Sequence, residues 1–464
     1  MRNGRLLILG NGGAALCAAR AARASGHLGE IHLASDVEGP AFNPMLAPYF
    51  LKGALPWERC FPFGPGFYDA HGITCHFGAA AERLDSRNRE VTLARGEKLS
   101  YDTCLVATGA APHVPPVPGL KGSSRVFFLR TAASARQLEE AIPQAKCALV
   151  LGASFVGLKV AEILTRRHIR VTLFDCADQV LPGGAHAASA AAIQALFERR
   201  GVDVRLGCAM EGMEGAGKGV VCHFTDGNIE AADLVVVCTG VEPNIEFLDP
   251  MQVKTDQAVL VDERLETSVR GLYAAGDASQ GINIISGRHE WLATWENACL
   301  QGRVAGRNMA GKGACYQGSL PQNIGLFFEW TYAHIGDVRG DVRGDVRGDP
   351  RGHSVLHRLF GSPSEGRFLV LAFSDNVLVG ANLINCAHLA GGLRRAIRER
   401  WRWEGSAQHG LSLEGVEKAL RRGTDDFRSR PGVSAPSDAF HCHDVFGREI
   451  GPPWTTRSRT LGGT

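Results

Sequence analysis

The sequence predicts an α/β fold with two βαβ units, followed by a smaller domain of mixed α and β structure. Three observations support this prediction. Residues 5–36 and 147–175 each contain an apolar strand, a glycine turn, a helix and a second strand that ends in aspartate. Residues 366–400 contain a hairpin-like pattern and then a helical one. At 464 residues the chain is long enough for several domains.

The first unit has a glycine turn of the GxGxxA type directly after its apolar strand. Gly10 allows a tight turn, Gly12 lets the backbone approach a pyrophosphate, and Ala15 allows the helix to pack closely on the strand. A phosphate would then lie at the helix N-terminus. Asp36 ends the second strand, where its carboxylate can accept hydrogen bonds from ribose hydroxyls. We predict nucleotide binding here; the alternative is a glycine turn that binds nothing.

The second unit repeats this pattern with one change. Gly152 and Gly157 frame the turn, but Ser154 replaces the middle glycine and crowds the approach to a pyrophosphate. Asp175 closes the second strand, where a carboxylate accepts from a ribose 2′-hydroxyl and repels a 2′-phosphate. No arginine follows in residues 176–182. We therefore expect NADH to be favoured over NADPH.

Composition gives no support for several function classes. The net charge is +2 and 45% of residues are hydrophobic, so nothing indicates binding to nucleic acid or to an anionic membrane. No apolar run approaches the roughly 18 residues of a membrane span, and we expect a soluble, cytoplasmic protein. The 13 cysteines show no CxxC or CxxxxC spacing, which argues against iron–sulfur and zinc sites. The set His441 to Asp444 is expected to be solvated tail; metal binding is the alternative.

Further motifs lie between and after the two units: ATGAAP with Thr108 and Gly109, LRT with Arg130, CTGVEPN with Gly240, and AAGD with Gly276 and Asp277. With the two units they resemble the FAD-dependent pyridine nucleotide–disulfide oxidoreductase superfamily. The resemblance implies two Rossmann-like domains, in which an NAD(P)H-binding domain is inserted into an FAD-binding domain, plus a C-terminal α+β domain. The implied boundaries are 1–118 and 244–318 for the FAD domain, 119–243 for the NAD(P)H domain, 319–400 for the C-terminal domain and 401–464 for a partly disordered tail.

The resemblance also implies roles for these residues. Asp277 would hold the ribityl and pyrophosphate part of FAD, and Thr108 and Gly109 would lie against the same cofactor. Arg130 would approach FAD, or else form a surface salt bridge. The segment TWENACLQG, residues 294–302, is similar to the corresponding segment of rubredoxin reductases and of the ferredoxin reductases that serve aromatic-ring dioxygenases. Trp295 would then lie beside the flavin ring, or else be an ordinary core residue.

The segment FNPMLAPYFLKG, residues 42–53, contains no cysteine. Disulfide reductases of the superfamily carry a CxxxxC pair near this place, and NADH oxidases carry a single cysteine. Cys60 lies too far along the chain, and Cys17 is expected to be a buried structural thiol. We therefore expect a member without a redox-active disulfide, whose electrons leave the flavin directly for a ferredoxin, a rubredoxin or an oxidoreductase subunit.

One departure from the family concerns charge near the flavin. Relatives often carry a lysine in the first segment and a glutamate in the second unit, where this chain has Pro48 and Lys159. We expect Lys159 to reach the flavin and stabilise its reduced anionic form. The alternative is a lysine that points along its helix into solvent.

The remaining sequence is less specific. Residues 336–352 form a GDVR repeat that we interpret as an expanded loop, and LSLEGVEKALRRG is a short helix in the tail. Arginines between residues 394 and 402 could attract an acidic partner or form a solvated helix face. The C-terminal domain is often used for dimer or partner contact in the family. The alternatives to an NADH-dependent reductase are an NADH oxidase or peroxidase, and a flavin-binding protein whose interactions respond to redox state.

Overall fold

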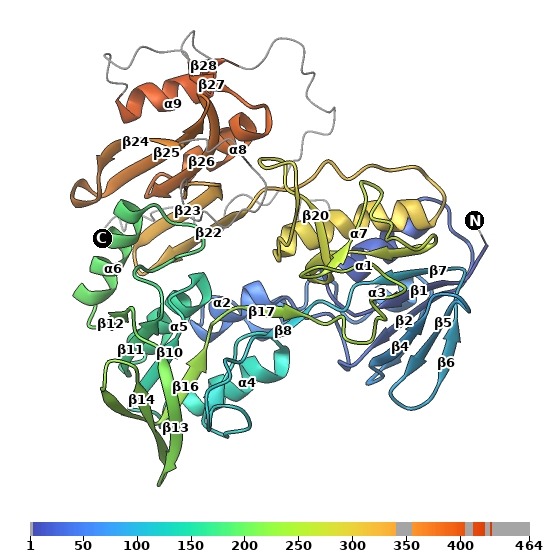
Figure 1. Cartoon of the computed structure of the whole chain (residues 1–464), viewed down its shortest axis with the longest axis horizontal. Coiled ribbons are helices and arrows are strands. Elements are labelled where there is room, and N and C mark those ends of the chain that lie inside the picture. The colour runs from blue at the N-terminus through green and yellow to red at the C-terminus, as the bar shows by residue number, and fades with distance from the viewer. Residues whose placement is uncertain (1–2, 340–354, 404–411, 423–426, 429–464) are drawn as a thin grey trace, which may run out of the picture. The chain divides into compact units, whose positions relative to one another are not determined.

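The computed structural model describes residues 3–339, 355–403, 412–422 and 427–428 (Figure 1). Most of the GDVR repeat therefore lies outside the described residues. So do the set from His441 to Asp444 and the greater part of the tail.

The first βαβ unit forms a five-stranded sheet in which every neighbouring pair is parallel. Its order is β19-β7-β1-β2-β3, with β1 Leu6–Leu9, β2 Ile31–Ser35, β3 Ile73–Phe77, β7 Thr103–Val106 and β19 Leu272–Ala274. All residues of β1 are buried, as expected for a central parallel strand. Helix α1 (Gly13–Ala24) follows the glycine turn and lies beside α7 (Trp295–Met309) (Figure 1). The predicted first unit is confirmed.

The second unit is a separate parallel sheet. Its order is β12-β11-β10-β16-β9, with β9 Val126–Phe127, β10 Cys147–Leu151, β11 Arg170–Asp175, β12 Asp203–Leu206 and β16 Leu234–Val237. The helices in this part of the chain are α4 Ala132–Ala141, α5 Phe155–Arg166 and α6 Ala187–Arg199. Strands β13 Met210–Ala216, β14 Gly219–Phe224 and β15 Ile229–Ala232 form an antiparallel sheet.

The chain enters and leaves the second unit through two strands that pair with each other. Strands β8 (Ala110–Pro112) and β17 (Val241–Pro243) are antiparallel. Such pairing is what an inserted domain requires, because its two ends must return to the same place in the parent fold. Two smaller sheets complete the parent fold: β4 Ala81–Asp85 with β5 Glu90–Leu93 and β6 Lys98–Ser100, and β18 Val259–Leu260 with β20 Ser279–Ile282 and β21 His289–Glu290.

The C-terminal part forms a separate antiparallel sheet, here called the C-terminal sheet. Five of its strands lie in the order β22-β23-β26-β25-β24, with β22 Gln322–Phe327, β23 Trp330–Gly336, β24 Val355–Ser362, β25 Arg367–Ser374 and β26 Val377–Ile384. Asp375 and Asn376 have φ angles of +50° and +63°, which suits a tight hairpin turn, so the predicted hairpin is confirmed. The predicted helices are also present, as α8 (Ala390–Arg398) and α9 (Leu413–Arg422).

The C-terminal sheet is hydrogen-bonded to the second unit just before α6. The carbonyl of Gly184 accepts from Asn382 Nδ2 at 2.9 Å and from Tyr332 Oη at 3.3 Å. The backbone N–H of His186 donates to Asn382 Oδ1 at 2.7 Å. One hydrophobic cluster continues from α5 and α6 into β22, β23, β25 and β26, so packing as well as hydrogen bonding joins the two parts.

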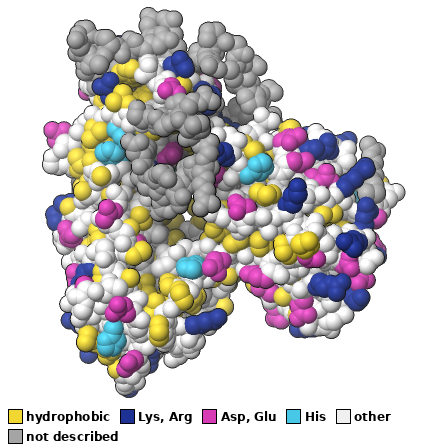
Figure 2. All heavy atoms as spheres, in the orientation of Figure 1, with side chains coloured by type: hydrophobic (Ala, Val, Ile, Leu, Met, Phe, Trp, Pro, Cys, Tyr) yellow, Lys and Arg dark blue, Asp and Glu magenta, His cyan; other side chains and the backbone are white. Residues whose placement is uncertain are grey.

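Two of the arginines after residue 393 form ion pairs within the chain. Arg394 pairs with Glu296 at 2.5 Å, and Arg395 pairs with Glu399 at 2.9 Å. Figure 2 shows acidic and basic side chains intermixed over the visible face of the described residues. The ion pairs of Arg394 and Arg395 reduce the positive charge that the arginines between residues 394 and 402 offer to an acidic partner. In the described part of the chain, no helix has both the length and the apolar character needed to cross a membrane.

Candidate functional site

The first glycine turn has the geometry that a phosphate requires. Gly10 has φ of +111°, and a Cβ atom there would lie 2.1 Å from the carbonyl oxygen of Ala107. A Cβ on Gly12 would meet nothing within 4 Å, and no side chain caps the start of α1. Ala15 is fully buried in that helix. The first-turn N–H groups of α1 are therefore free of side-chain acceptors, and the turn fits the pyrophosphate of a dinucleotide.

A second loop lies beside this turn, at the end of β7. Gly109 has φ of +71°, and the Thr108 hydroxyl donates to the carbonyl of Asn244 at 2.6 Å. Asn244 returns two hydrogen bonds, from its backbone N–H to Gly109 O at 3.0 Å and from Nδ2 to Thr108 O at 3.1 Å. Asn244 thus fixes the Thr108–Gly109 loop where the chain leaves the second unit. Sequence reasoning did not assign it this role.

Asp277 and Arg130 come together although they lie far apart in the sequence. Arg130 Nη2 is 2.5 Å from Asp277 Oδ2, and Arg130 Nε donates to Ala110 O at 2.9 Å. The two side chains are 24% and 12% exposed, so the pair is partly buried rather than a surface salt bridge. Gly276, with φ of +75°, donates its backbone N–H to Gln301 Oε1 at 2.7 Å. The structure therefore brings two separately predicted residues into one charged pair.

Two other predicted residues border the first unit. Asp36 is exposed at the end of β2, with its Oδ1 3.4 Å from the hydroxyl of Ser35. Trp295 is half-buried at the first residue of α7. Its ring atom Cζ2 lies 3.1 Å from the point where Gly13 would carry a Cβ. The indole thus packs against the start of α1, next to the phosphate turn.

In the second unit, the substitution of serine for glycine has a structural explanation. Gly152 has φ of +102°, and a Cβ on Gly157 would lie 1.8 Å from Gly152 O, so both positions need glycine. Ser154 is the N-cap of α5: its Oγ accepts from Gly157 N at 3.2 Å and donates to Cys238 O at 3.0 Å. One N–H of this turn is therefore already satisfied, unlike the uncapped start of α1.

Asp175 binds the backbone of the same turn. Its Oδ2 accepts from Ala153 N at 2.6 Å and its Oδ1 accepts from Ala177 N at 2.9 Å. Gly240, with φ of +107°, closes the unit, and a Cβ there would meet nothing within 4 Å. Each carboxylate oxygen of Asp175 keeps a further lone pair that can accept from a ribose hydroxyl.

Lys159 is buried rather than solvated. Its side chain lies on α5 and the residue is 5% exposed, so the alternative of a lysine pointing into solvent is wrong. Its Nζ donates to the carbonyl of Leu326 and lies 5.1 Å from the ring centre of Tyr49 and 5.3 Å from that of Phe327. Burial lowers the pKa of Lys159 from 10.5 to about 8; Glu162 opposes this shift and Lys52 adds to it.

A lysine–glutamate pair joins the end of α2 to α5. The comparison with relatives had suggested that both of these charges were lost from the chain. Lys52 Nζ lies 2.5 Å from Glu162 Oε1, and Arg166 Nε lies 2.9 Å from the same oxygen. Lys52 is four residues after Pro48, and Glu162 is three after Lys159, so the pair is moved about one turn along each helix. Glu162 is fully buried. Its Oε2 has no hydrogen-bond partner within the described ranges.

The segment 42–53 forms a short 3-10 turn, Pro44–Leu46, and helix α2 (Ala47–Leu51). The expectation that Cys60 is remote from it needs correction, because Asn43 N donates to Cys60 O at 2.8 Å. The sulfur is nevertheless poorly suited to redox chemistry. Cys60 is fully buried, and burial raises the pKa of its thiol to about 11. A thiol held in its protonated form is a weak nucleophile.

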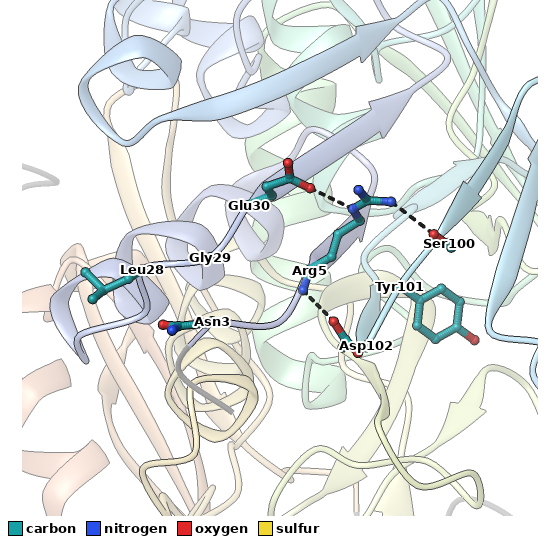
Figure 3. Close-up of a pocket in the computed structure, with 8 residues that line it drawn as sticks. All are labelled: Asn3, Arg5, Leu28, Gly29, Glu30, Ser100, Tyr101 and Asp102. Atoms are coloured by element: carbon teal, nitrogen blue, oxygen red, sulfur yellow. Dashed lines mark hydrogen bonds and ion pairs between the residues drawn. The ribbon is translucent and has the colours of Figure 1, made fainter.

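The structure also contains a polar pocket at the N-terminal ends of the strands of the first sheet (Figure 3). Arg5, Glu30 and Asp102 line it, and each precedes a strand, whereas the glycine turns follow strands. Arg5 donates to all its charged neighbours there: to Glu30 Oε2 at 2.8 Å from Nε and to Asp102 Oδ2 at 2.7 Å from its backbone N–H. Ligands of open parallel sheets bind at the carboxyl ends of strands, so this pocket lies outside the nucleotide site. Among the described residues, no group of three or more His, Cys, Asp or Glu side chains could hold a metal.

Comparisons with known proteins agree with this geometry. The family pattern described as pyridine nucleotide-disulphide oxidoreductase matches residues 4–302. The chain is 32% identical to the NADH-dependent phenylglyoxylate dehydrogenase subunit epsilon of Aromatoleum evansii, over 70% of this chain and 77% of that protein. It is 31% identical to an NADH oxidase of Methanocaldococcus jannaschii, over 66% of this chain and 70% of that protein.

A third relative and a solved structure extend the match. The chain is 28% identical to the ferredoxin–NAD(+) reductase component of an anthranilate 1,2-dioxygenase system from Burkholderia cepacia, over 84% of this chain and 93% of that protein. The reductase in a covalent putidaredoxin reductase–putidaredoxin complex has the same fold, with a TM-score of 0.80 at 24% identity, covering 91% of this chain and 100% of that one. The predicted fold class is confirmed by the family match and the solved structure. The predicted cofactors, FAD and NADH, are confirmed by the family match and the reductase relative. The chain belongs to the pyridine nucleotide-disulphide oxidoreductase family and is an NAD(P)H-dependent oxidoreductase.

Proposed function

We propose that this protein is an NADH-dependent FAD flavoprotein that passes electrons to a small redox protein or to a redox subunit of a larger complex. The observation that carries the proposal is a complete pair of dinucleotide turns without a reactive cysteine in the segment 42–53. Flavin accepts a hydride as an electron pair and releases electrons singly. The chain binds both nucleotides, orients them and excludes water, and the electrons pass directly to the external acceptor.

Each predicted nucleotide-binding residue has a place in this proposal, and Lys159 and Trp295 are the residues proposed to contact the flavin ring. The FAD site comprises Gly10, Gly12, Ala15, Asp36, Thr108, Gly109, Arg130, Gly276 and Asp277. The NADH site comprises Gly152, Ser154, Gly157, Asp175 and Gly240. The domain boundaries predicted from the sequence follow from this division into an FAD site and an NADH site. The pairing of β8 with β17 supports the insertion of the NAD(P)H-binding domain into the FAD-binding domain. A cytoplasmic location and a homodimer formed through the C-terminal domain stay predictions.

The acceptor is tested by comparing rates. The dioxygenase reductase from Burkholderia cepacia supports a ferredoxin acceptor, and the phenylglyoxylate dehydrogenase subunit supports a subunit of a larger complex. We expect NADH oxidation to be slow in air and fast without oxygen when a ferredoxin or rubredoxin is supplied. The relative from Methanocaldococcus jannaschii favours an NADH oxidase instead. Oxygen-dependent turnover that no redox protein accelerates would support that alternative, and slow flavin reduction by NADH would support an interaction protein.

Asp175 is predicted to set the preference between NADH and NADPH. Its carboxylate would accept from the ribose 2′-hydroxyl and repel a 2′-phosphate, so kcat/KM should favour NADH by at least about tenfold, equivalent to about 1.4 kcal/mol. Asp175→Asn keeps the shape and removes the charge, and should narrow this ratio. Steady-state rates with both cofactors measure it. Exposed Asp178 is the control, because Asp178→Asn should leave the ratio unchanged. Equal wild-type kcat/KM values would contradict the assignment.

Lys159 is predicted to make flavin reduction depend on pH. We propose that its ammonium faces bound flavin and stabilises negative charge there, and the adjacent Tyr49 in the segment 42–53 supports this position. Because the pKa of Lys159 is lowered to about 8, the cation is present below that pH and lost above it. The rate of flavin reduction by NADH should therefore fall as pH rises through about 8.

The test compares wild type with Lys159→Met by stopped-flow reduction across this pH range. The variant should be slower at low pH, should lose the step near pH 8 and should have a lower flavin potential. Exposed Lys312→Met is the control and should keep the wild-type profile. An unchanged pH profile and potential in Lys159→Met would remove Lys159 from the catalytic site. Trp295, the other residue proposed to contact the flavin ring, would be unaffected by that result.

A further inference from the structure

We propose that Cys17 and Cys299 form a peroxide-sensitive dithiol that closes to a disulfide between α1 and α7. The two residues lie on different helices of the first unit, outside the segment where the family carries its redox cysteines. The proposal is independent of which acceptor receives electrons from the flavin. It follows from close helix packing, contact between the sulfurs and the charges around them.

The helices approach each other closely enough for a covalent bridge. A Cβ on Gly302 would lie 2.1 Å from Ala14 O, and a Cβ on Gly306 would lie 2.1 Å from Ala18 O. Only glycine at both positions allows α7 to rest directly on the backbone of α1. A disulfide needs Cα atoms about 4.4–6.8 Å apart, which helices in backbone contact can provide.

The sulfur atoms meet at this crossing. Cys299 Sγ lies 2.9 Å from the point where Gly13 would carry a Cβ. Cys17 is four residues after Gly13 in the same helix, so both face α7. Each of these two thiols shifts the pKa of the other, which places them close together. Cys17 is 2% exposed and Cys299 is half-buried. A small oxidant would therefore reach the pair from the more exposed side, at Cys299.

The surrounding charges favour one thiolate and one thiol. Arg20 Nη2 lies 4.0 Å from Cys17 Sγ, and Arg303 is one turn after Cys299 on α7. The hydrogen bond from Cys299 and these two cations lower the pKa of Cys17, against the effect of burial. The pKa of Cys299 is raised, first by the same hydrogen bond and then by burial. By contrast, burial alone raises the pKa of Cys238 to about 12.

This pairing permits a balanced oxidation by hydrogen peroxide. The Cys17 thiolate attacks one peroxide oxygen, which breaks the O–O bond, forms a sulfenic acid and releases hydroxide. The Cys299 sulfur then attacks the sulfenic sulfur, forming the S–S bond and displacing a second hydroxide, which takes the Cys299 proton and leaves as water. Two thiols are oxidised and one peroxide is reduced to water. The product would tie the phosphate-turn helix α1 to the helix that begins at Trp295.

The test uses the full-length holoenzyme, reduced with dithiothreitol, desalted and treated with hydrogen peroxide. Non-reducing peptide mapping should recover the peptide of Cys17 joined to that of Cys299, and the thermal unfolding temperature should rise. Cys17→Ser and Cys299→Ser should each abolish the cross-link and the rise. Cys315→Ser, which removes an exposed thiol, is the control and should keep both.

Two results would overturn the proposal. One is oxidation of Cys17 to sulfinic or sulfonic acid in wild type without a cross-link to Cys299. The other is no modification of either sulfur when the exposed Cys176 and Cys315 have fully reacted. If buried Cys17→Ser fails to fold, Cys299→Ser alone still decides the matter. In that variant Cys17 should be overoxidised, because its resolving partner is gone.

Discussion

Asp277→Ala should purify with little bound FAD. In the proposed site the Asp277 carboxylate accepts from the ribityl and pyrophosphate part of the cofactor, and in the structure it is held in place by Arg130 at 2.5 Å. A hydrogen bond to a charged group contributes about 1.5–3 kcal/mol, so FAD should bind roughly ten- to a hundredfold more weakly. The ratio of flavin to protein absorbance in the purified variant and a titration of the apoprotein with FAD measure this loss.

Two variants separate a direct contact from a structural effect. Arg130→Gln removes the ion pair but leaves the carboxylate, so it should lose less FAD than Asp277→Ala. Exposed Asp249→Ala should retain full flavin. Full flavin in folded Asp277→Ala protein would contradict the site assignment, and an equal loss in both pair variants would assign the effect to the pair itself.

Lys52→Met should markedly destabilise the fold. Lys52 is 19% exposed and faces Glu162, whose side chain is 0% exposed. Removing the lysine leaves a buried carboxylate with Arg166 as its remaining cation. Loss of one partner from a buried pair costs about 3–5 kcal/mol, because the other charge is then uncompensated. Urea unfolding of FAD-saturated protein should show this as a lower midpoint.

A double-mutant cycle isolates the pair. Lys52→Met with Glu162→Leu should recover most of the lost stability, since apolar residues of similar size often replace a buried pair without cost. Arg166→Met is the matched control: Arg166 is 45% exposed and bonds the same oxygen, so its loss should cost about 0.5 kcal/mol. Equal, small effects of the Lys52 and Arg166 variants would show that the pair adds little.

Local sequence patterns predicted the elements around both turns correctly. Gly10, Gly152 and the hairpin residues Asp375 and Asn376 have the positive φ angles that their residue types favour. Such features depend on neighbours within a few residues. They are therefore readable from the sequence, as are the strands and helices that they join.

Contacts between distant segments were less predictable. The Arg130–Asp277 pair and the Lys52–Glu162 pair each join residues more than a hundred positions apart, and no local pattern encodes them. The comparison with relatives showed that Pro48 and Lys159 replace a lysine and a glutamate. It did not show that Lys52 and Glu162 form such a pair one helical turn later. The Cys17–Cys299 contact did have a signal, since Gly302 and Gly306 are spaced one turn apart on α7.

The path of the electrons is the central claim, and an anaerobic titration of air-oxidised protein with NADH tests it most directly. We would follow the oxidised flavin band in wild type and in Cys17→Ser. Complete bleaching by one equivalent of NADH in both proteins is the predicted result, because the flavin is then the sole centre that takes these electrons. A second equivalent consumed by wild type and not by Cys17→Ser would contradict the account, since the Cys17–Cys299 pair would then accept electrons from the flavin.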